Sequence, residues 1–156
     1  MMKTVSRFAF QLGIKIALNA NFAVKKAGRY FLLNEALKKV VAKDFYYAGT
    51  YLGKVKNGKF FPSFSLLAML ARGEANKIVV EKKAAWLFIC GRDVLRKGIL
   101  SVRGSRKKGS HTLVFNEFGE CLGFGKIIGR LDEVAKKNEV VVRNISDIGD
   151  FLRREA

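Results

Sequence analysis

Residues 90–102 read Cys90-Gly91-Arg92-Asp93-Val94-Leu95-Arg96-Lys97-Gly98-Ile99-Leu100-Ser101-Val102. This segment predicts one tight helical turn that runs directly into a strand, with Asp93 capping the turn and Gly98 ending it at a positive φ. Arg92 and Arg96 are four residues apart, so on a helical turn they would share one face. The resulting cationic edge is a candidate contact surface for an acidic partner. An ordinary surface ion pair with solvated arginines beside it explains the same sequence pattern equally well.

The net charge narrows the class of partner. The 156 residues contain 30 Lys or Arg and 13 Asp or Glu, which gives a formal net charge of +17 at pH 7. Residues 1–78 carry 14 basic and three acidic side chains, so the excess is greatest in this half. A hydrophobic fraction of 49% is enough for a packed core. We therefore expect a folded protein with a polyanionic partner, namely RNA, DNA or an anionic membrane.

The sequence argues against a membrane-spanning, secreted or metal-binding protein. No apolar run reaches the roughly 18–20 residues that a spanning helix needs, and no signal-peptide cleavage pattern is present. Cys90 and Cys121 lie far apart with only His111 as a further ligand, whereas zinc sites use closely spaced pairs. We expect two reduced core thiols, no metal or other cofactor, and a cytoplasmic protein.

Apolar spacing and turn residues predict a small α+β domain in the first half of the chain. Apolar residues recur at three- and four-residue steps near the start, and Asn-Gly is the strongest signal for a type I′ hairpin turn. The predicted elements are a helix over residues 1–13, a hairpin with its tip at residues 25–29, a helix over residues 35–42, a hairpin with its tip at Asn57-Gly58, and a helix capped by Ser63 or Ser65.

Short strands dominate the second half and indicate a small mixed β barrel. The predicted strands cover residues 77–81, 99–102, 112–115, 121–128 and 140–143, and a terminal helix begins at Ser146-Asp147. Gly123 and Gly125 share one of these strands. Two glycines in a strand either let a sugar–phosphate backbone approach closely or relieve the curvature of a barrel, and the sequence leaves both interpretations open.

Three segments carry a resemblance to known proteins: Gly91–Gly98 (GRDVLRKG), Leu122–Gly125 (LGFG) and Asp147–Glu155 (DIGDFLRRE). Their succession looks like the PUA domain, the RNA-binding module of pseudouridine synthases and archaeosine transglycosylases. More narrowly, it is similar to the large-ribosomal-subunit biogenesis factor family known in yeast as nuclear import protein seven. The likeness extends upstream through residues 48–54 and 60–68. Residues 1–40 match that family poorly and look shorter than the same region of its eukaryotic members, which indicates an archaeal-type homologue.

The resemblance implies an α+β domain over residues 1–76, with an antiparallel sheet, followed by a PUA-type mixed β pseudobarrel over residues 77–156. It implies a monomeric, non-catalytic protein that binds precursor ribosomal RNA during maturation of the large subunit. Its RNA face would consist of Arg92, Arg96, Lys97, Lys126, Arg130, Arg153 and Arg154. Candidates for stacking on unpaired bases are Tyr30, Tyr46, Tyr47, Tyr51 and Phe124. The N-terminal domain would either dock proteins of the pre-ribosomal particle or continue the RNA path.

Two other functions stay open at this point. One is an RNA-modifying enzyme or its accessory subunit, of the pseudouridine synthase or methyltransferase class. Against it, the glycine-rich strand misses the dinucleotide fingerprint by one residue, and Ile127 stands where a phosphate loop needs Ser or Thr. The acids available to an N-terminal catalytic site are Glu35, Asp44 and Glu74. The other is a structural ribosomal protein, which would be retained in mature particles.

Overall fold

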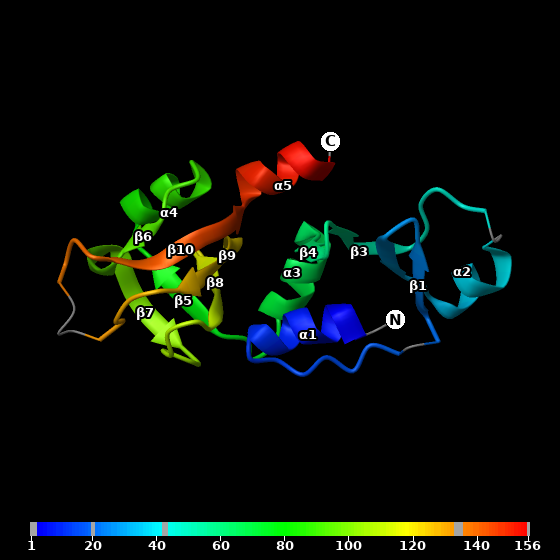
Figure 1. The fold of residues 1–156 in the computed structure, drawn as a ribbon, viewed down its shortest axis with the longest axis horizontal. Coiled ribbons are helices and arrows are strands. Elements are labelled where there is room, and N and C mark those ends of the chain that lie inside the picture. The colour runs from blue at the N-terminus through cyan, green and yellow to red at the C-terminus, as the bar shows by residue number, and fades with distance from the viewer. Residues whose placement is uncertain (1–2, 20, 42–43, 133–135, 156) are drawn as a thin grey trace.

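Two β-sheets with helices between them make up the fold (Figure 1). The computed structural model describes residues 3–19, 21–41, 44–132 and 136–155. The helices are α1 (Lys3–Gln11), α2 (Glu35–Val40), α3 (Phe64–Ala71), α4 (Lys82–Ile89), the single 3₁₀ turn η1 (Arg96–Gly98) and α5 (Ile148–Glu155). The strands are β1 (Ala23–Lys26), β2 (Arg29–Leu32), β3 (Thr50–Lys56), β4 (Lys59–Pro62), β5 (Lys77–Val80), β6 (Val94–Leu95), β7 (Ile99–Arg103), β8 (His111–Phe115), β9 (Cys121–Ile127) and β10 (Val140–Asp147). Among the helices of the described residues, none is long and apolar enough to cross a bilayer.

The first sheet is antiparallel, in the order β1-β2-β3-β4. Both of its hairpins close through two residues of positive φ, Ala27-Gly28 (48° and 76°) and Asn57-Gly58 (50° and 71°), which matches the type I′ turn expected at Asn57-Gly58. Ser63 caps α3, since its Oγ accepts a hydrogen bond from the backbone N–H of Leu66 at 3.0 Å. The predicted helices over 1–13 and 35–42 are present as α1 and α2, with residues 1, 2 and 42 outside the described ranges.

The second sheet is mixed and curled, in the order β6-β10-β9-β8-β5-β7. The pairing of β5 with β8 is parallel, and the other pairings are antiparallel. One hydrophobic cluster packs against this sheet, and Ile78, Val142 and the α4 residue Phe88 contribute fully buried side chains to it. The predicted α+β class, with an antiparallel sheet followed by a mixed β pseudobarrel, is confirmed.

A second hydrophobic cluster joins the two sheets and contains residues from both halves of the chain. The ring of Phe8 on α1 lies edge-on to Phe60 of β4 at 5.5 Å and to Phe124 of β9 at 5.2 Å, measured between centroids. Leu113 on β8 and Phe151 on α5 belong to the same cluster. Figure 1 shows α1 and α3 between the sheet that β1 begins and the curled sheet beside α4. The outer face of the curled sheet is therefore packed against the N-terminal half.

The structure corrects the interpretation of residues 90–102. Val94 and Leu95 form the short strand β6 paired with β10, rather than part of a helical turn. Arg92 precedes this strand and Arg96 follows it, so the two arginines do not share a helix face. The Asp93 carboxylate accepts a hydrogen bond from the N–H of Asn144 at 2.8 Å and so holds β10 instead of capping a turn.

Gly98 is required for close packing and not for a positive φ. Its φ lies outside the left-handed region, whereas a Cβ at this position would come 2.6 Å from the Cβ of Ala84 on α4. Real Cβ atoms do not approach each other this closely, so any larger residue would push η1 away from α4. Glycine is thus required at position 98, but because of close packing against α4 and not because of a positive φ.

The two cysteines differ in environment, and the prediction that both lie in the core is wrong for Cys90. Cys90 is free and exposed at the end of α4, while Cys121, at the start of β9, is free and partly buried. Burial raises the pKa of Cys121 to about 11, and a smaller opposing effect comes from a backbone hydrogen bond of Gly123. The Cys121 thiol is therefore protonated at neutral pH and a poor nucleophile.

This difference predicts selective alkylation. At pH 8, iodoacetamide should modify Cys90 quickly and leave Cys121 largely unmodified until denaturant exposes it, because the reactive species is the thiolate. Mass spectrometry of the intact protein and of its peptides measures both sites. The variant Cys90→Ser is the control and should take up no label in its folded state. Rapid labelling of Cys121 in native Cys90→Ser would contradict the environment described for β9.

Candidate nucleic-acid interface

Three polar side chains lie side by side across the second sheet. His111 on β8 pairs with Lys126 on β9, and Lys126 pairs with Arg143 on β10. Residues directly opposite each other in antiparallel strands project from the same face, with Cβ atoms about 4.5–5.5 Å apart. His111, Lys126 and Arg143 therefore form one short row, which we call the sheet row. Lys126 and Arg143 are exposed, and His111 is partly buried.

The electrostatics of the sheet row favour an anionic ligand. In the described residues the ion pairs are Lys26–Asp44, Lys39–Glu35 and Arg130–Asp132, and none involves Lys126 or Arg143. Burial, followed by the positive charge of Lys126, lowers the pKa of His111. His111 is thus neutral at pH 7. Its Nδ1 is buried and has no hydrogen-bond partner within the described part of the chain.

Strand pairing, rather than helix geometry, creates the sheet row. Phe124, two residues before Lys126 on β9, packs into the cluster between the sheets, and its ring lies 5.8 Å from that of His111. His111, at one end of the sheet row, therefore lies at the edge of this apolar contact. Asn76, just before β5, donates from Nδ2 to the carbonyl of His111 at 3.1 Å and fixes the start of β8.

Gly123 and Gly125 do not offer an open strand to a ligand. Both are buried, and a Cβ on Gly123 would come 2.1 Å from the carbonyl oxygen of Ser146. A Cβ on Gly125 would come 2.5 Å from the carbonyl oxygen of Arg143. The interpretation that they admit a sugar–phosphate backbone is therefore wrong, because the backbone they admit is that of β10.

Two of the predicted RNA-binding arginines lie together at Asp132. Arg130 forms an ion pair with the Asp132 carboxylate at 3.1 Å, and Nε of Arg96 donates to the backbone carbonyl of Asp132 at 2.9 Å. Arg96, Arg106 and Asp132 line a cleft of about 300 Å³ beside β7. Because Asp132 supplies a negative charge here, this cleft is a weaker anion site than the sheet row.

The remaining predicted cations are dispersed. Arg92 is exposed in the connection between α4 and β6, and Lys97 is exposed on η1, where its N–H donates to the carbonyl of Lys137 at 2.9 Å. Arg153 is exposed on α5, and its Nη1 lies 3.2 Å from the position that a Cβ of Gly149 would occupy. The side chain of Arg154 lies outside the described part of the structure.

The predicted stacking residues divide into buried and exposed groups. Tyr30 and Phe124 are 5% and 3% exposed and are core residues, so the prediction that they stack on bases is wrong. Tyr51 is partly buried against Phe31. Tyr46 and Tyr47 are 79% and 60% exposed, with the Arg29 guanidinium over the Tyr46 ring at 4.9 Å and Phe31 edge-on to Tyr47. The sequence patterns did not distinguish these groups.

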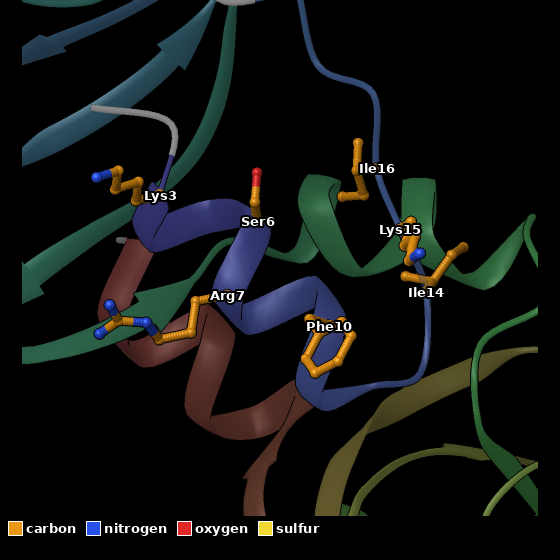
Figure 2. A pocket seen from close by; sticks show the side chains of 7 residues that line it. All are labelled: Lys3, Ser6, Arg7, Phe10, Ile14, Lys15 and Ile16. Atoms are coloured by element: carbon orange, nitrogen blue, oxygen red, sulfur yellow. The ribbon is translucent and has the colours of Figure 1, made fainter.

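A basic groove runs along α1, next to the segment that follows it (Figure 2). Its volume is about 550 Å³, within the range of small-ligand sites. Figure 2 shows the α1 side chains on one wall and residues 14–16 on the other. The groove, here called the α1 groove, is lined by Lys3, Ser6, Arg7, Phe10, Ile14, Lys15 and Ile16. The lining includes three cations and no carboxylate.

Sequence reasoning missed the members of the sheet row other than Lys126. In the sequence His111 stands out only as an isolated potential zinc ligand, but it is the first residue of β8. Arg143 follows the buried pair Val141 and Val142. This local pattern indicates only that the Arg143 side chain lies at the end of a buried run. Its position beside Lys126 depends on the pairing of β9 with β10, which no local signal reveals. Within the described residues, no cluster of three or more metal-ligating side chains is present.

Comparison with known proteins identifies the second half of the chain. The family profile described as the UPF0113 PUA domain matches residues 76–156. The chain belongs to the UPF0113 PUA domain family. A relative from Archaeoglobus fulgidus, named only as a UPF0113 protein, is 31% identical over 114 residues, which are 70% of this chain and 63% of the relative. The match thus spans less than two thirds of the length of that family member.

Solved structures show the same fold. A conserved PUA domain protein from Thermoplasma acidophilum is 22% identical, with a TM-score of 0.65 over 98% of this chain and 92% of that one. A hypothetical protein from Pyrococcus horikoshii is 17% identical, with a TM-score of 0.56 over 85% of this chain and 77% of that one. At these identities the similarity establishes the fold alone, which this chain shares with both solved proteins.

Proposed function

We propose that this UPF0113 protein binds single-stranded RNA without catalysing a reaction, through the sheet row of its PUA domain. PUA domains usually bind RNA, and the observation that carries the proposal here is the alignment of Lys126 and Arg143 beside neutral His111. Cations that lack carboxylate partners retain their full attraction for phosphates, and they gain affinity through counterion release. The net charge of +17 extends the attraction over the molecule.

We further propose that the RNA is precursor ribosomal RNA and that the protein acts in maturation of the large ribosomal subunit. The support is the resemblance of residues 91–98, 122–125 and 147–155 to the nuclear import protein seven family. Membership of UPF0113 and the archaeal relatives are compatible with an archaeal-type homologue.

The non-catalytic part of the proposal rests on the acids of the first half. Glu35, Asp44 and Glu74 are all exposed. A hydrogen bond from Lys26 at 2.8 Å and the charge of that lysine lower the pKa of Asp44. A carboxyl group in this state remains ionised and is a poor general acid. A base-modification assay with Glu35→Gln, Asp44→Asn and Glu74→Gln tests this point, and any modification that depends on one of them would contradict it.

Neutralising the sheet row should reduce the salt dependence of RNA binding. For Lys126→Gln/Arg143→Gln, the slope of log affinity against log salt is expected to fall by about 1.4, or about 0.7 for each lost phosphate contact. Fluorescence anisotropy with a labelled oligouridine at several salt concentrations measures the slope. Lys82→Gln/Lys83→Gln on α4 removes two exposed charges elsewhere and is the matched control. Equal slopes for the two double variants would exclude the sheet row as the RNA-binding site. Arg153→Ala tests the predicted contribution of α5 to RNA binding separately.

Crosslinking in native cells tests the proposed process. Ultraviolet crosslinks clustered on precursor large-subunit RNA, with the protein absent from mature particles, are the expected result. Stoichiometric retention in mature ribosomes would support the ribosomal-protein alternative. Crosslinks confined to one modified nucleotide or spread over transfer RNA would support the modifying-enzyme alternative.

A further inference from the structure

One buried residue, Asn76, hydrogen-bonds both to the segment that follows α1, beside the α1 groove, and to the first residue of the sheet row. The N–H of Asn76 donates to the carbonyl of Leu12 at 2.7 Å, while its Nδ2 donates to the carbonyl of His111 at 3.1 Å. Gly13 lies against the same side chain, since a Cβ there would come 2.7 Å from the Asn76 Oδ1. One residue therefore connects the first residue of β8 to the end of α1, next to Ile14 in the groove lining.

The side chains in the α1 groove suit a nucleotide better than an apolar helix. Phe10 is 68% exposed although it lies one turn or less from the buried residues Phe8 and Leu12. Its ring, seen in Figure 2 at the front of α1, is therefore available to a base. Arg7 and Lys15 flank it along the groove, and both are exposed. Among the described ion pairs, none neutralises either cation.

The charge of the α1 groove favours an anionic polymer as its ligand. The groove lining contains three cations and no acid, so an acidic polymer gains attraction along its whole length. An exposed aromatic ring beside phosphate-binding cations is the arrangement by which proteins hold single-stranded nucleic acid, because every base presents a π face. A basic or neutral protein segment would leave these charges without partners.

We propose that single-stranded RNA continues from the sheet row into the α1 groove, where one unpaired base stacks on Phe10 and adjoining phosphates contact Arg7 and Lys15. This inference rests on the proposed RNA-binding function and assigns part of the RNA path to the N-terminal half. The PUA domain alone then does not hold the full length of RNA that the protein contacts.

A pair of oligonucleotides separates stacking from charge. The full chain is titrated with a labelled oligouridine and with an abasic oligomer of the same length and charge. Phe10→Ala should weaken binding of oligouridine about tenfold, which lies within the range of one base–aromatic stack. It should leave binding of the abasic oligomer unchanged. Arg7→Gln/Lys15→Gln should instead reduce the salt slope for both oligomers, by about 0.7 for each contact.

Phe118→Ala is the matched control, because it removes the same ring at another exposed position, 84% exposed, that lies outside the groove lining. It should bind both oligomers as the unmodified protein does. If Phe118→Ala loses base-dependent affinity and Phe10→Ala does not, the RNA path lies over the connection between β8 and β9 and the groove assignment is overturned.

The outcomes also distinguish this inference from the proposed function. If Phe10→Ala and Arg7→Gln/Lys15→Gln bind both oligomers normally while Lys126→Gln/Arg143→Gln does not, RNA binding stands and the α1 groove is excluded as its continuation. The groove would then be a docking face for protein. If the unmodified chain binds neither oligomer, the proposed function itself fails.

Discussion

Replacing Phe8 with Ala is expected to lower the free energy of unfolding by about 3–5 kcal/mol, the usual cost of truncating a buried Phe. The ring is 6% exposed and contacts Phe60 on the first sheet and Phe124 on the second. Its removal leaves a cavity between the two sheets. Neither sheet can close this cavity without shifting relative to the other sheet. Urea denaturation followed by circular dichroism measures the change.

Phe10→Ala is the control for this experiment, since it removes the same side chain two residues later on the same helix. Phe10 is 68% exposed, so the free energy of unfolding should change by no more than about 0.5 kcal/mol. Similar losses for the two variants would contradict the assignment of Phe8 to the joint core. A small effect at Phe10 also shows that Phe10→Ala is folded, as the RNA titrations require.

Gly123→Ala is expected to destabilise the protein by about 2–5 kcal/mol, from backbone strain and steric overlap together. Gly123 has a φ of 147°, which other residues rarely adopt. In addition, a Cβ would overlap the carbonyl oxygen of Ser146, at 2.1 Å. Strands β9 and β10 would have to separate at this point, so the pairing that aligns Lys126 with Arg143 should weaken as well.

The control is Gly119→Ala, because Gly119 also has a positive φ, of 79°, but nothing lies within 4 Å of a Cβ there. Only conformational strain remains, and about 1–2 kcal/mol is expected. A result in which both alanines cost the same would show that steric contact with β10 is unimportant. In that case the interpretation of Gly123 as a strand-packing residue would have to be abandoned.

Local signals predicted the elements whose cause is local. Asn57-Gly58 supplies the two positive φ values of its turn, and Ser63 caps α3 through its own hydroxyl. The spacing of Val5 and Phe8 gave the buried face of α1. These features depend on residues within four positions of each other, so a single sequence contains the information needed to predict them.

Features that depend on distant partners could not be predicted in this way. Val94-Leu95 is a strand only because β10 pairs with it, and no pattern of two residues indicates that partner. His111 and Arg143 join Lys126 through strand register, across separations of 15 and 17 positions along the chain. Burial of Tyr30 on β2 depends on which side of the first sheet faces α1, and Tyr46 is exposed in the connection before β3; composition specifies neither.

The joint core has a consequence for how the chain folds during synthesis. Val5 and Phe8 near one end and Phe151 near the other belong to the same hydrophobic cluster, so the cluster is incomplete until residue 151 has left the ribosome. Helix α1 is therefore synthesised long before the last residues of its cluster. Until those residues emerge, the incomplete cluster stays open to chaperones or to premature contacts with other nascent chains. Contacts of such long sequence separation also predict slow folding relative to a helical bundle of equal length.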